Sequence, residues 1–358
     1  MLDMSVASML TQDSFLINLP LGFITVVFIV FFFKSPGKKN TTKTPWREQV
    51  KKLDFEGSAV FLPGVVCLLL ALQWGGSVYP WSNWRPILCL VLFALLIAAF
   101  IAIQIRKQER ATVPPRVLKQ RTVCAAAWFS ACIGASFFIM LYYLPIWFQA
   151  IKHVSATKSG LMSLPLVLGL VVLSIVAGVG VTVTGYYTPF CIASSILAAI
   201  GAGLCSTFTV NTGHPKWIGY QLLFGVGLGL GLQQPLIAVQ AVLPAADVPI
   251  GTAIVMFSQT LGGALFVSVA QNVFENRLLQ GLQASVSDLD PAIVVNGGAT
   301  SLVKNVPPAD LAKVLVAYNN TLTQVFYVAI AMAALSLIGS LLMEWKSVKG
   351  QKMEMGAA

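Results

Sequence analysis

Charged side chains are scarce in this sequence of 358 residues: Asp, Glu, Lys and Arg make up 10% of it, against about 25% in a typical soluble domain. Apolar residues make up 57%, more than a soluble core of this size can bury. Charged residues are absent altogether from nine long segments, at about 15–33, 57–74, 86–105, 124–147, 159–181, 188–208, 217–241, 250–273 and 322–343. A helix needs roughly 20 apolar residues to cross a hydrocarbon core. The sequence therefore predicts an all-α polytopic membrane protein with about nine transmembrane helices.

Other scarcities argue against an enzyme. The sequence holds only two histidines, His153 and His214, each in a predicted loop beside a lysine. The acidic residues are scattered over the connections, so no cluster of ionisable side chains is expected at a membrane face. All six cysteines lie within predicted spans and none forms a Cys-x-x-Cys pair, so neither a disulfide framework nor a metal site is expected. The N-terminus lacks the basic start and the cleavage site of a secretory signal peptide.

Basic residues are unevenly distributed along the chain, whose net charge is +10. They gather in the connections 34–56 and 106–121 and after the last span, at 346–352. The positive-inside rule then predicts an N-terminus outside and a C-terminus in the cytoplasm. We interpret this charge as a topology signal that also attracts anionic lipid, with the lipid bilayer as a partner and nucleic acid as none.

Loop length and charge divide the chain into four parts. Residues 1–33 hold a lone helix, 34–121 two central helices between basic linkers, 122–345 a six-helix bundle, and 346–358 a cytoplasmic tail. Within the bundle, the outer connection 274–321 is the longest. Two weakly amphipathic stretches in it, 277–286 and 310–318, predict short helices lying on the outer surface.

Glycine and amide residues interrupt the lipid-like pattern in the segment GVGLGLGLQQP. Two small-xxx-small pairs, Gly225 with Gly229 and Gly227 with Gly231, are typical of close helix packing. Gln233 and Gln234 either face a cavity or make ordinary interhelical hydrogen bonds. Pro235 predicts a break in the helix near its cytoplasmic end.

Two further segments could contribute to a cavity. Gln259, Gly262 and Gly263 lie within one helical turn and give that helix a thin polar face. Tyr142 and Tyr143, together with Trp147 and Phe148 around a predicted break at Pro145, either line an aromatic substrate pocket or form an interfacial belt.

These motifs carry a family resemblance. The segments YYLPIWFQAIKHVSATKSGLMSLPLVLG, GVGLGLGLQQP and GTAIVMFSQTLGGALFVSVAQNVF resemble the C-terminal half of the fourteen-span drug:proton antiporters of the major facilitator superfamily, nearest to fungal toxin and multidrug efflux pumps. INLPLG at 17–22 resembles the start of that family's sixth helix, and LDFEG at 53–57 the lead into its seventh. The nine predicted spans then correspond to the sixth helix, two extra central helices and the six-helix C-terminal half. The family's first five helices have no counterpart in this sequence.

The resemblance implies a proton-coupled efflux pump of the plasma membrane that exports small apolar molecules, such as drugs, toxins or secondary metabolites, by alternating access. Gln233, Gln259 and Tyr142 would face the cavity; a proton gradient, and no bound cofactor, would drive transport. No span here carries Asp, Glu or His, the usual proton carriers. The alternative is a truncated or incorrectly predicted gene product that does not transport, or one that pairs with a separate N-terminal half.

A short loop and two glycosylation sequons lead to further predictions. Family members commonly place Lys or Arg around positions 183, 186 and 188, whereas this chain has Val183, Tyr186 and Thr188, so the charge that would hold this short loop at the cytoplasmic side is missing. Asn40 and Asn319 each begin a glycosylation sequon. The predicted topology leaves Asn319 as the possible glycosylation site, against the outer membrane surface.

Overall fold

The computed structural model describes residues 18–32, 54–76, 78–108, 111–285 and 306–349. These fall into two units, one comprising 1–51 with 354–358 and the other 52–353. The first contains a single described helix, α2 (Asn18–Phe32). The predicted sequon at Asn40 lies outside the described residues.

The described residues confirm the all-α prediction. The second unit contains α4 (Phe55–Trp74), α5 (Trp84–Lys107), α6 (Pro115–Leu118), α7 (Arg121–Ile151), α8 (Ala156–Met162), α9 (Leu164–Thr184), α10 (Thr188–Cys205), α11 (His214–Gly231), α12 (Gln234–Val242), α13 (Val248–Ser285) and α16 (Pro308–Leu342). Eight spans within the described residues are long and apolar enough to cross a membrane, with α8 continuing into α9 and α11 into α12. The ninth predicted span, 15–33, contains α2, whose 15 residues are the only part of it that the structure describes.

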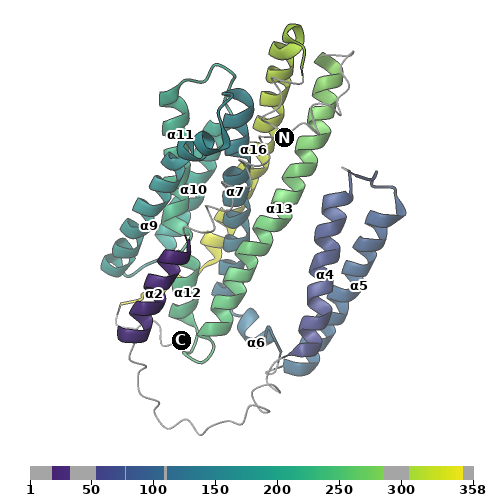
Figure 1. Cartoon of the computed structure of the whole chain (residues 1–358). Coiled ribbons are helices and arrows are strands. Elements are labelled where there is room, and N and C mark those ends of the chain that lie inside the picture. Colours follow the sequence, from purple (N-terminus) through teal and green to yellow (C-terminus); the bar gives the residue numbers. More distant parts are fainter. Residues whose placement is uncertain (1–17, 33–53, 77, 109–110, 286–305, 350–358) are drawn as a thin grey trace. The chain divides into compact units, whose positions relative to one another are not determined.

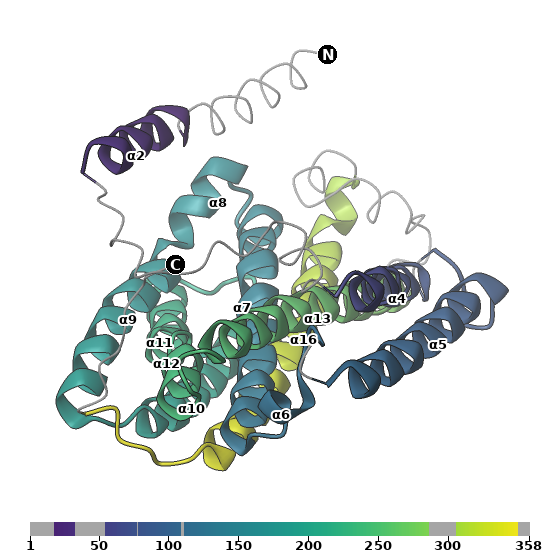
Figure 2. The same cartoon turned by 90° about the horizontal axis from the view of Figure 1, so that it is seen from below.

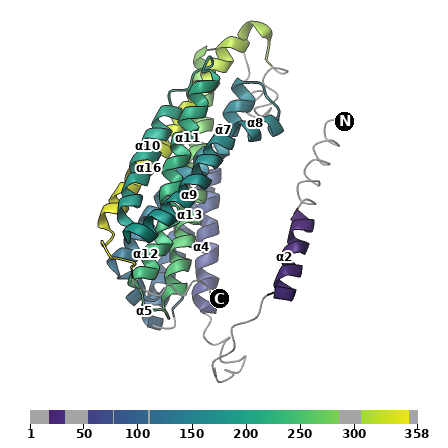
Figure 3. The same cartoon turned by 90° about the vertical axis from the view of Figure 1, so that its left-hand side faces the viewer.

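The bundle is built around α7. This helix packs against α13, α16 and α12, whereas α9 packs mainly against α11. Figure 2, which looks along the helices, shows α7 in the middle and α9 at the edge. Figure 3 shows α10, α11 and α16 running side by side. The core is accordingly richest on α7, where Phe129, Ile139 and Leu144 are fully buried.

Helices α4 and α5 form an antiparallel pair that joins the bundle through α13 (Figure 1). The Phe61 ring of α4 lies 5.2 Å from the Phe257 ring of α13, centroid to centroid. At the other end of α4, the Asn272 side-chain amide donates a 2.6 Å hydrogen bond to the Leu72 carbonyl oxygen. That carbonyl belongs to the last turn of α4, where the helix leaves carbonyls without an internal partner.

Two sequence expectations are wrong. The predicted break at Pro145 does not occur, because α7 continues through it to Ile151. Proline removes one backbone donor, but Leu144, Trp147 and Phe148 on either side are fully buried, and their packing keeps this turn helical.

The long outer connection is also shorter than expected. The stretches 277–286 and 310–318 do not form separate surface helices: the first continues α13 as far as Ser285, and the second is the start of α16. Their apolar residues explain the difference, since Leu278 and Leu282 of α13 are buried in the same cluster as Val314 and Tyr318 of α16. The two helices therefore continue to pack on each other beyond the apolar segments.

Candidate functional site

An apolar groove lies between α7 and α13, with a volume of about 370 Å³. It is lined by Phe138, Leu141, Tyr142, Thr260, Gly263, Ala264 and Val267. The only polar side-chain atoms among these residues are the hydroxyls of Tyr142 and Thr260. Thr260 donates its proton back to the Met256 carbonyl oxygen at 2.9 Å, so its oxygen is left as an acceptor toward a bound molecule.

Glycines bring the two helices of the groove together. A β-carbon added to Gly134 of α7 would lie 2.6 Å from the Gln259 carbonyl oxygen of α13, and one added to Gly262 of α13 would contact the Ala131 carbonyl. Gly263 faces the Phe138 ring. Small residues at such a crossing allow backbones to approach closely. The groove therefore lies beside a tight helix crossing, with Gly263 at its base and aromatic rings along its sides.

The two neighbouring tyrosines have different environments. Tyr142 is 57% exposed and lines the groove, whereas Tyr143 is 2% exposed and contacts the Phe274 ring at 5.8 Å. Successive helical residues point in directions about 100° apart, which separates them. Trp147 and Phe148 are fully buried, so they are neither part of an open pocket nor an interfacial belt.

The predicted amides lie elsewhere. Gln233 is exposed in the two-residue turn between α11 and α12, and Pro235 follows in the first turn of α12, where a missing N–H is tolerated. Gln234 is 1% exposed, and its side-chain oxygen has no hydrogen-bond partner among the described residues. Gln259 is half-buried and does not line the groove.

The four glycines of α11 alternate between two neighbouring helices. Gly225 and Gly229 contact the Leu166 and Leu170 carbonyls of α9, respectively. Gly227 contacts the backbone of α10 at Ala198, and Gly231 contacts Ser194 of α10. The pairs thus let α11 lie against α9 on one side and α10 on the other.

Of the sequence candidates, only Tyr142 and Gly263 meet in the groove. Sequence reasoning missed Phe138, Leu141, Thr260, Ala264 and Val267. A usable signal was present: the three residues of α7 and the four of α13 each recur at spacings of three and four, which puts them on one helix face. Nothing in the sequence says that these two faces meet.

Asn319 has a structural role at the end of the bundle where α7 ends. It is 4% exposed, accepts a 2.8 Å hydrogen bond from the Trp147 indole N–H and donates one of 2.9 Å to the Phe208 carbonyl oxygen. Glycosylation requires a surface asparagine. The expectation that Asn319 is a glycosylation site is therefore wrong, because its amide is buried and engaged between α7, α16 and the residues after α10.

The opposite end of the second unit is held by polar contacts. The Asp54 carboxylate accepts hydrogen bonds from the Gly57 backbone at 2.9 Å, from Gln104 at 2.8 Å, from Lys107 at 2.9 Å and from the Thr112 hydroxyl at 3.0 Å. Burial alone would raise the pKa of Asp54, but these donors outweigh it and hold that pKa well below its ordinary value. Asp54 thus begins α4 and ties it to the end of α5.

A second tie joins α6 to the connection before α13. The two terminal guanidinium nitrogens of Arg116 lie 2.8 and 3.0 Å from the two carboxylate oxygens of Asp247. Such two-point pairing fixes orientation as well as distance.

The loop between α9 and α10, which lacks the expected basic residues, is held by the segment after α16. We call residues 343–349 the tail strap. The Val348 N–H donates to the Gly185 carbonyl oxygen at 2.9 Å, and the Tyr187 hydroxyl donates to the Glu344 carbonyl oxygen at 2.6 Å. Burial raises the pKa of Tyr187 to about 12, so its hydroxyl stays protonated as the donor. Gly185 has φ +84° and an added β-carbon would lie 3.1 Å from the Ser347 hydroxyl, so only glycine suits this contact.

Comparison with curated proteins adds the family. The chain is 48% identical to an MFS acetylaranotin efflux transporter of Aspergillus terreus over 94% of this chain and 75% of the relative. This chain belongs to the major facilitator superfamily (MFS). It is also 56% identical to an MFS-type efflux pump of Arthroderma benhamiae, over 96% of this chain and 64% of the relative, and 49% identical to an efflux pump of Penicillium rubens, over 94% and 62%. No family model matches the chain.

Membership in this superfamily makes the chain a multi-pass membrane protein, in agreement with the eight candidate spans among its described residues. The chain spans less than two thirds of the length of the Arthroderma and Penicillium pumps. Within the described ranges, no three His, Cys, Asp or Glu side chains gather in a group that could hold a metal ion.

Proposed function

We propose that this chain provides the substrate-facing surface of an efflux transporter for small, mostly apolar molecules, and that the groove between α7 and α13 contacts the substrate. The relatives named as efflux pumps support the reaction class. The groove supports the substrate class: its walls are apolar, and its two hydroxyls suit a molecule with few hydrogen-bonding groups. Alternating access then requires that the groove be exposed to each side of the membrane in turn.

The structure suggests where substrate specificity is set. Tyr142 offers a ring and a hydroxyl at the exposed edge, and Thr260 offers an acceptor oxygen from the opposite wall. Gly263 keeps the floor open, because any side chain there would meet Phe138. We infer that the size and flatness of the substrate are selected by this floor and that its orientation is selected by the two hydroxyls.

The test is substrate-dependent export by the full chain in a host that lacks its own efflux pumps. Export above the empty-vector level is expected, and its absence at normal membrane abundance would contradict independent transport. Ala264→Trp should fill the groove and abolish export. Ala98→Trp on the exposed side of α5 is the matched control and should leave export unchanged. If both variants export like the parent, the groove does not contact the substrate.

We also propose that the chain acts as a carrier and not as an enzyme, without a bound cofactor and without nucleic acid as a partner. The transport driving force would be the proton gradient, as in the family that the sequence resembles. The names of the relatives support the carrier class, and the uneven distribution of basic residues supports a lipid partner.

The orientation that we propose places the C-terminus in the cytoplasm and the N-terminus outside, in the plasma membrane. It rests on the basic connections 34–56 and 106–121. Asn211 and Lys346, both exposed, lie at opposite ends of the bundle. In intact cells, a membrane-impermeant thiol reagent should label Asn211→Cys and not Lys346→Cys, relative to the labelling of the native cysteines. The reverse pattern would overturn this topology.

A further inference from the structure

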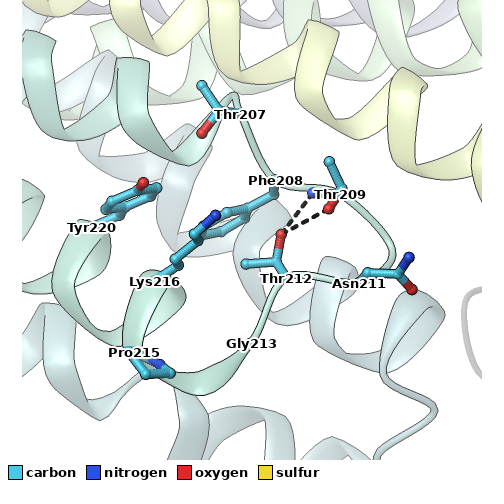
Figure 4. A pocket seen from close by; sticks show the side chains of 9 residues that line it. All are labelled: Thr207, Phe208, Thr209, Asn211, Thr212, Gly213, Pro215, Lys216 and Tyr220. Carbon is cyan, nitrogen blue, oxygen red and sulfur yellow. Dashed lines mark hydrogen bonds between the residues drawn. The ribbon is translucent and has the colours of Figure 1, made fainter.

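The connections at the two ends of α10 are held in different ways. After α10, the connection to α11 closes on itself, because the Thr212 hydroxyl accepts a 2.8 Å hydrogen bond from the Thr209 N–H (Figure 4). Before α10, the loop from α9 is held by a separate segment, the tail strap. A segment near a chain terminus detaches more readily than an internal turn. The strap is therefore a part of the bundle on which an outside signal can act.

The strap joins the start of α7 to the end of α16 and to the loop before α10. The Glu344 N–H donates to the Thr122 hydroxyl of α7 at 3.4 Å, and the Glu344 carbonyl oxygen accepts the hydrogen bond from Tyr187. Two strap side chains, Met343 and Val348, are buried. These contacts are few, so the strap can detach while the helices stay folded.

Ser347 is the one hydroxyl-bearing residue among residues 343–349, and it lies against the loop. Its oxygen accepts a 3.2 Å hydrogen bond from the Lys349 N–H and lies 3.1 Å from the position of a β-carbon added to Gly185. Ser347 itself is exposed, as are the lysines on either side of it, Lys346 and Lys349. Charge patterns around the target residue direct kinase specificity. Ser347 is therefore suited to a serine kinase that selects basic neighbours.

The docked strap protects Ser347 from such a kinase. The next residue, Val348, is buried, and its N–H is bonded to the Gly185 carbonyl oxygen at 2.9 Å. A kinase active site must surround its target residue, so it reaches the backbone at Ser347 only when the strap has detached. Modification then acts on the detached state and holds the strap there if the phosphate opposes redocking.

The loop offers no cation that would hold a phosphate. Residues 182–188 include no Lys, Arg or His, and Val183, Tyr186 and Thr188 stand where basic residues are common in the family. The loop group beside Ser347 is the backbone of Gly185. A phosphoserine carries a charge of about −1.5 to −2 at pH 7 and three acceptor oxygens.

Redocking would therefore place an anion beside backbone carbonyls and remove part of its hydration without a compensating cation on the loop. Lys346 and Lys349 do not change this balance, because they belong to the strap and accompany the phosphate whether the strap is docked or detached.

We propose that Ser347 is a phosphorylation site and that its modification releases the tail strap. The Ser347 oxygen attacks the γ-phosphorus of ATP bound to a cytoplasmic serine kinase. The new O–P bond replaces the bond to the β-phosphate, ADP leaves, and the hydroxyl proton passes to the catalytic aspartate of the kinase. The proposal rests on the orientation proposed above, which places the C-terminus on the side of the membrane that contains ATP.

The first test is phosphorylation of the full purified chain in detergent by a serine kinase that selects basic residues, with Mg²⁺, ATP and site mapping by mass spectrometry. Ser347 should be phosphorylated in the parent and about five-fold faster in Tyr187→Phe, because one lost hydrogen bond raises the detached population by about that factor. Tyr186→Phe is the matched control and should react like the parent. Absence of phosphate from Ser347 in both the parent and Tyr187→Phe would overturn the proposal.

The second test measures release of the strap. Val348→Cys places a thiol at a buried position, so its labelling by a thiol reagent, relative to the native cysteines, reports detachment. Adding Ser347→Glu should speed this labelling by about three-fold, the effect of a single surface charge. Lys346→Gln changes the charge by the same one unit at an exposed neighbouring position and is the matched control, which should leave labelling unchanged.

Equal labelling rates in the two double variants would show that charge at Ser347 does not release the strap, and the proposal would be wrong. Both tests use purified protein. They can therefore fail while transport and the proposed orientation stand, since export and labelling of intact cells test those separately.

Discussion

Helices α5 and α7 are both apolar spans of similar character in the sequence, yet they have opposite surroundings. Only 6% of the most apolar stretch of α5 is buried within the protein, compared with 67% for α7, although α5 is the more apolar of the two. In a bilayer, lipid accepts apolar side chains as readily as a protein interior does. High hydropathy therefore does not by itself predict burial within the protein, which depends on close helix packing.

The residues of the two helices show how this packing arises. α7 carries Gly134, Ser130 and Ser136 among its buried positions, and backbone contacts at Gly134 bring α13 close. On α5 the exposed positions include large aliphatic residues such as Leu92 and Leu95. The central pair α4–α5 is instead attached at a few points, among them the Phe61–Phe257 contact and the Asn272 hydrogen bond to α4. The following substitutions would break or sharpen this contrast.

The largest effect is expected from a bulky side chain within the bundle. Gly225→Leu would push a side chain into the Leu166 carbonyl of α9, and backbone cannot yield as a flexible side chain does. We expect loss of the folded, monodisperse protein in fluorescence-detected size-exclusion chromatography. Gly178→Leu on α9, where no atom lies within 4 Å of an added β-carbon, is the matched control and should fold normally. Equal behaviour of the two variants would argue against close packing between α9 and α11.

The next effect concerns the anchor of the central pair. Asp54→Asn removes the charge to which Lys107, Gln104 and Thr112 donate hydrogen bonds. The free energy of unfolding should fall by about 3 kcal/mol, which is the low end for a broken buried ion pair because Lys107 is partly exposed. Thermal unfolding in detergent measures it. Glu56→Gln, which removes the exposed partner of Lys107, is the control and should change stability by less than about 1 kcal/mol.

The Asp54 anchor also predicts a pH dependence. The folded-state pKa of Asp54 lies below its ordinary value of about 4, so the ionised form is favoured in the folded protein. Its stabilisation is fully present above pH 4 or so and is lost as the pH falls from there toward the folded-state pKa. The parent should therefore lose more stability than Asp54→Asn on acidification through this range, and parallel curves would contradict the assignment.

A direct comparison of the two helices comes from one truncation in each. Leu144→Ala empties a fully buried position of α7 and should cost about 2 kcal/mol, at the lower end for a core leucine because lipid removes the hydrophobic part of the loss. Leu95→Ala on α5, where the leucine is 62% exposed, should change stability by less than about 0.5 kcal/mol. Thermal unfolding of both variants in the same detergent measures these losses of stability. Similar losses in the two variants would show that Leu95 of α5 is more buried than it is in this structure.

The smallest effect is expected at the tail strap. Tyr187→Phe removes one hydrogen bond to the Glu344 carbonyl oxygen and should cost about 1 kcal/mol. The more specific measurement is protease cleavage after Lys346 or Lys349, which should become faster as the strap detaches more often. Tyr186→Phe removes a hydroxyl that makes no hydrogen bond to the strap among the described residues, and it should leave cleavage unchanged. Faster cleavage in both variants would point to a general loosening of the loop.

The sequence predicted much of the fold because its signals are local. Charge-free stretches and their basic borders placed the helices from α4 to α12 within a few residues, since each span must satisfy its own backbone, whereas the end of α13 and the start of α16 were placed more than ten residues away. The extension of α13 to Ser285 was missed because Leu278 and Leu282 are buried by α16, a partner far away in the chain. The continuity of α7 through Pro145 was missed for the same reason, because tertiary packing overrides the local penalty of proline.

The candidate site was only partly predictable. Aromatic and glycine residues at helical spacing indicated helix faces of interest, and Tyr142 and Gly263 do lie in the groove. The polar residues were misleading. Gln234, Tyr143 and Asn319 are unusual residues for a membrane span, but the sequence looks the same whether such a side chain faces a cavity or packs against another helix. Asn319 illustrates this: its sequon suggested the surface, whereas its amide bridges Trp147 and Phe208 in the interior.

By itself, the sequence determined that this protein is a helical membrane protein, where its spans lie and which family it resembles, because hydrocarbon imposes length and charge rules that a single helix obeys on its own. Only the tertiary structure decided which spans are buried, that α7 and α13 form the groove, and that the tail strap holds the loop whose basic residues are missing. Those outcomes depend on which faces meet, and lipid-facing and protein-facing residues are equally apolar.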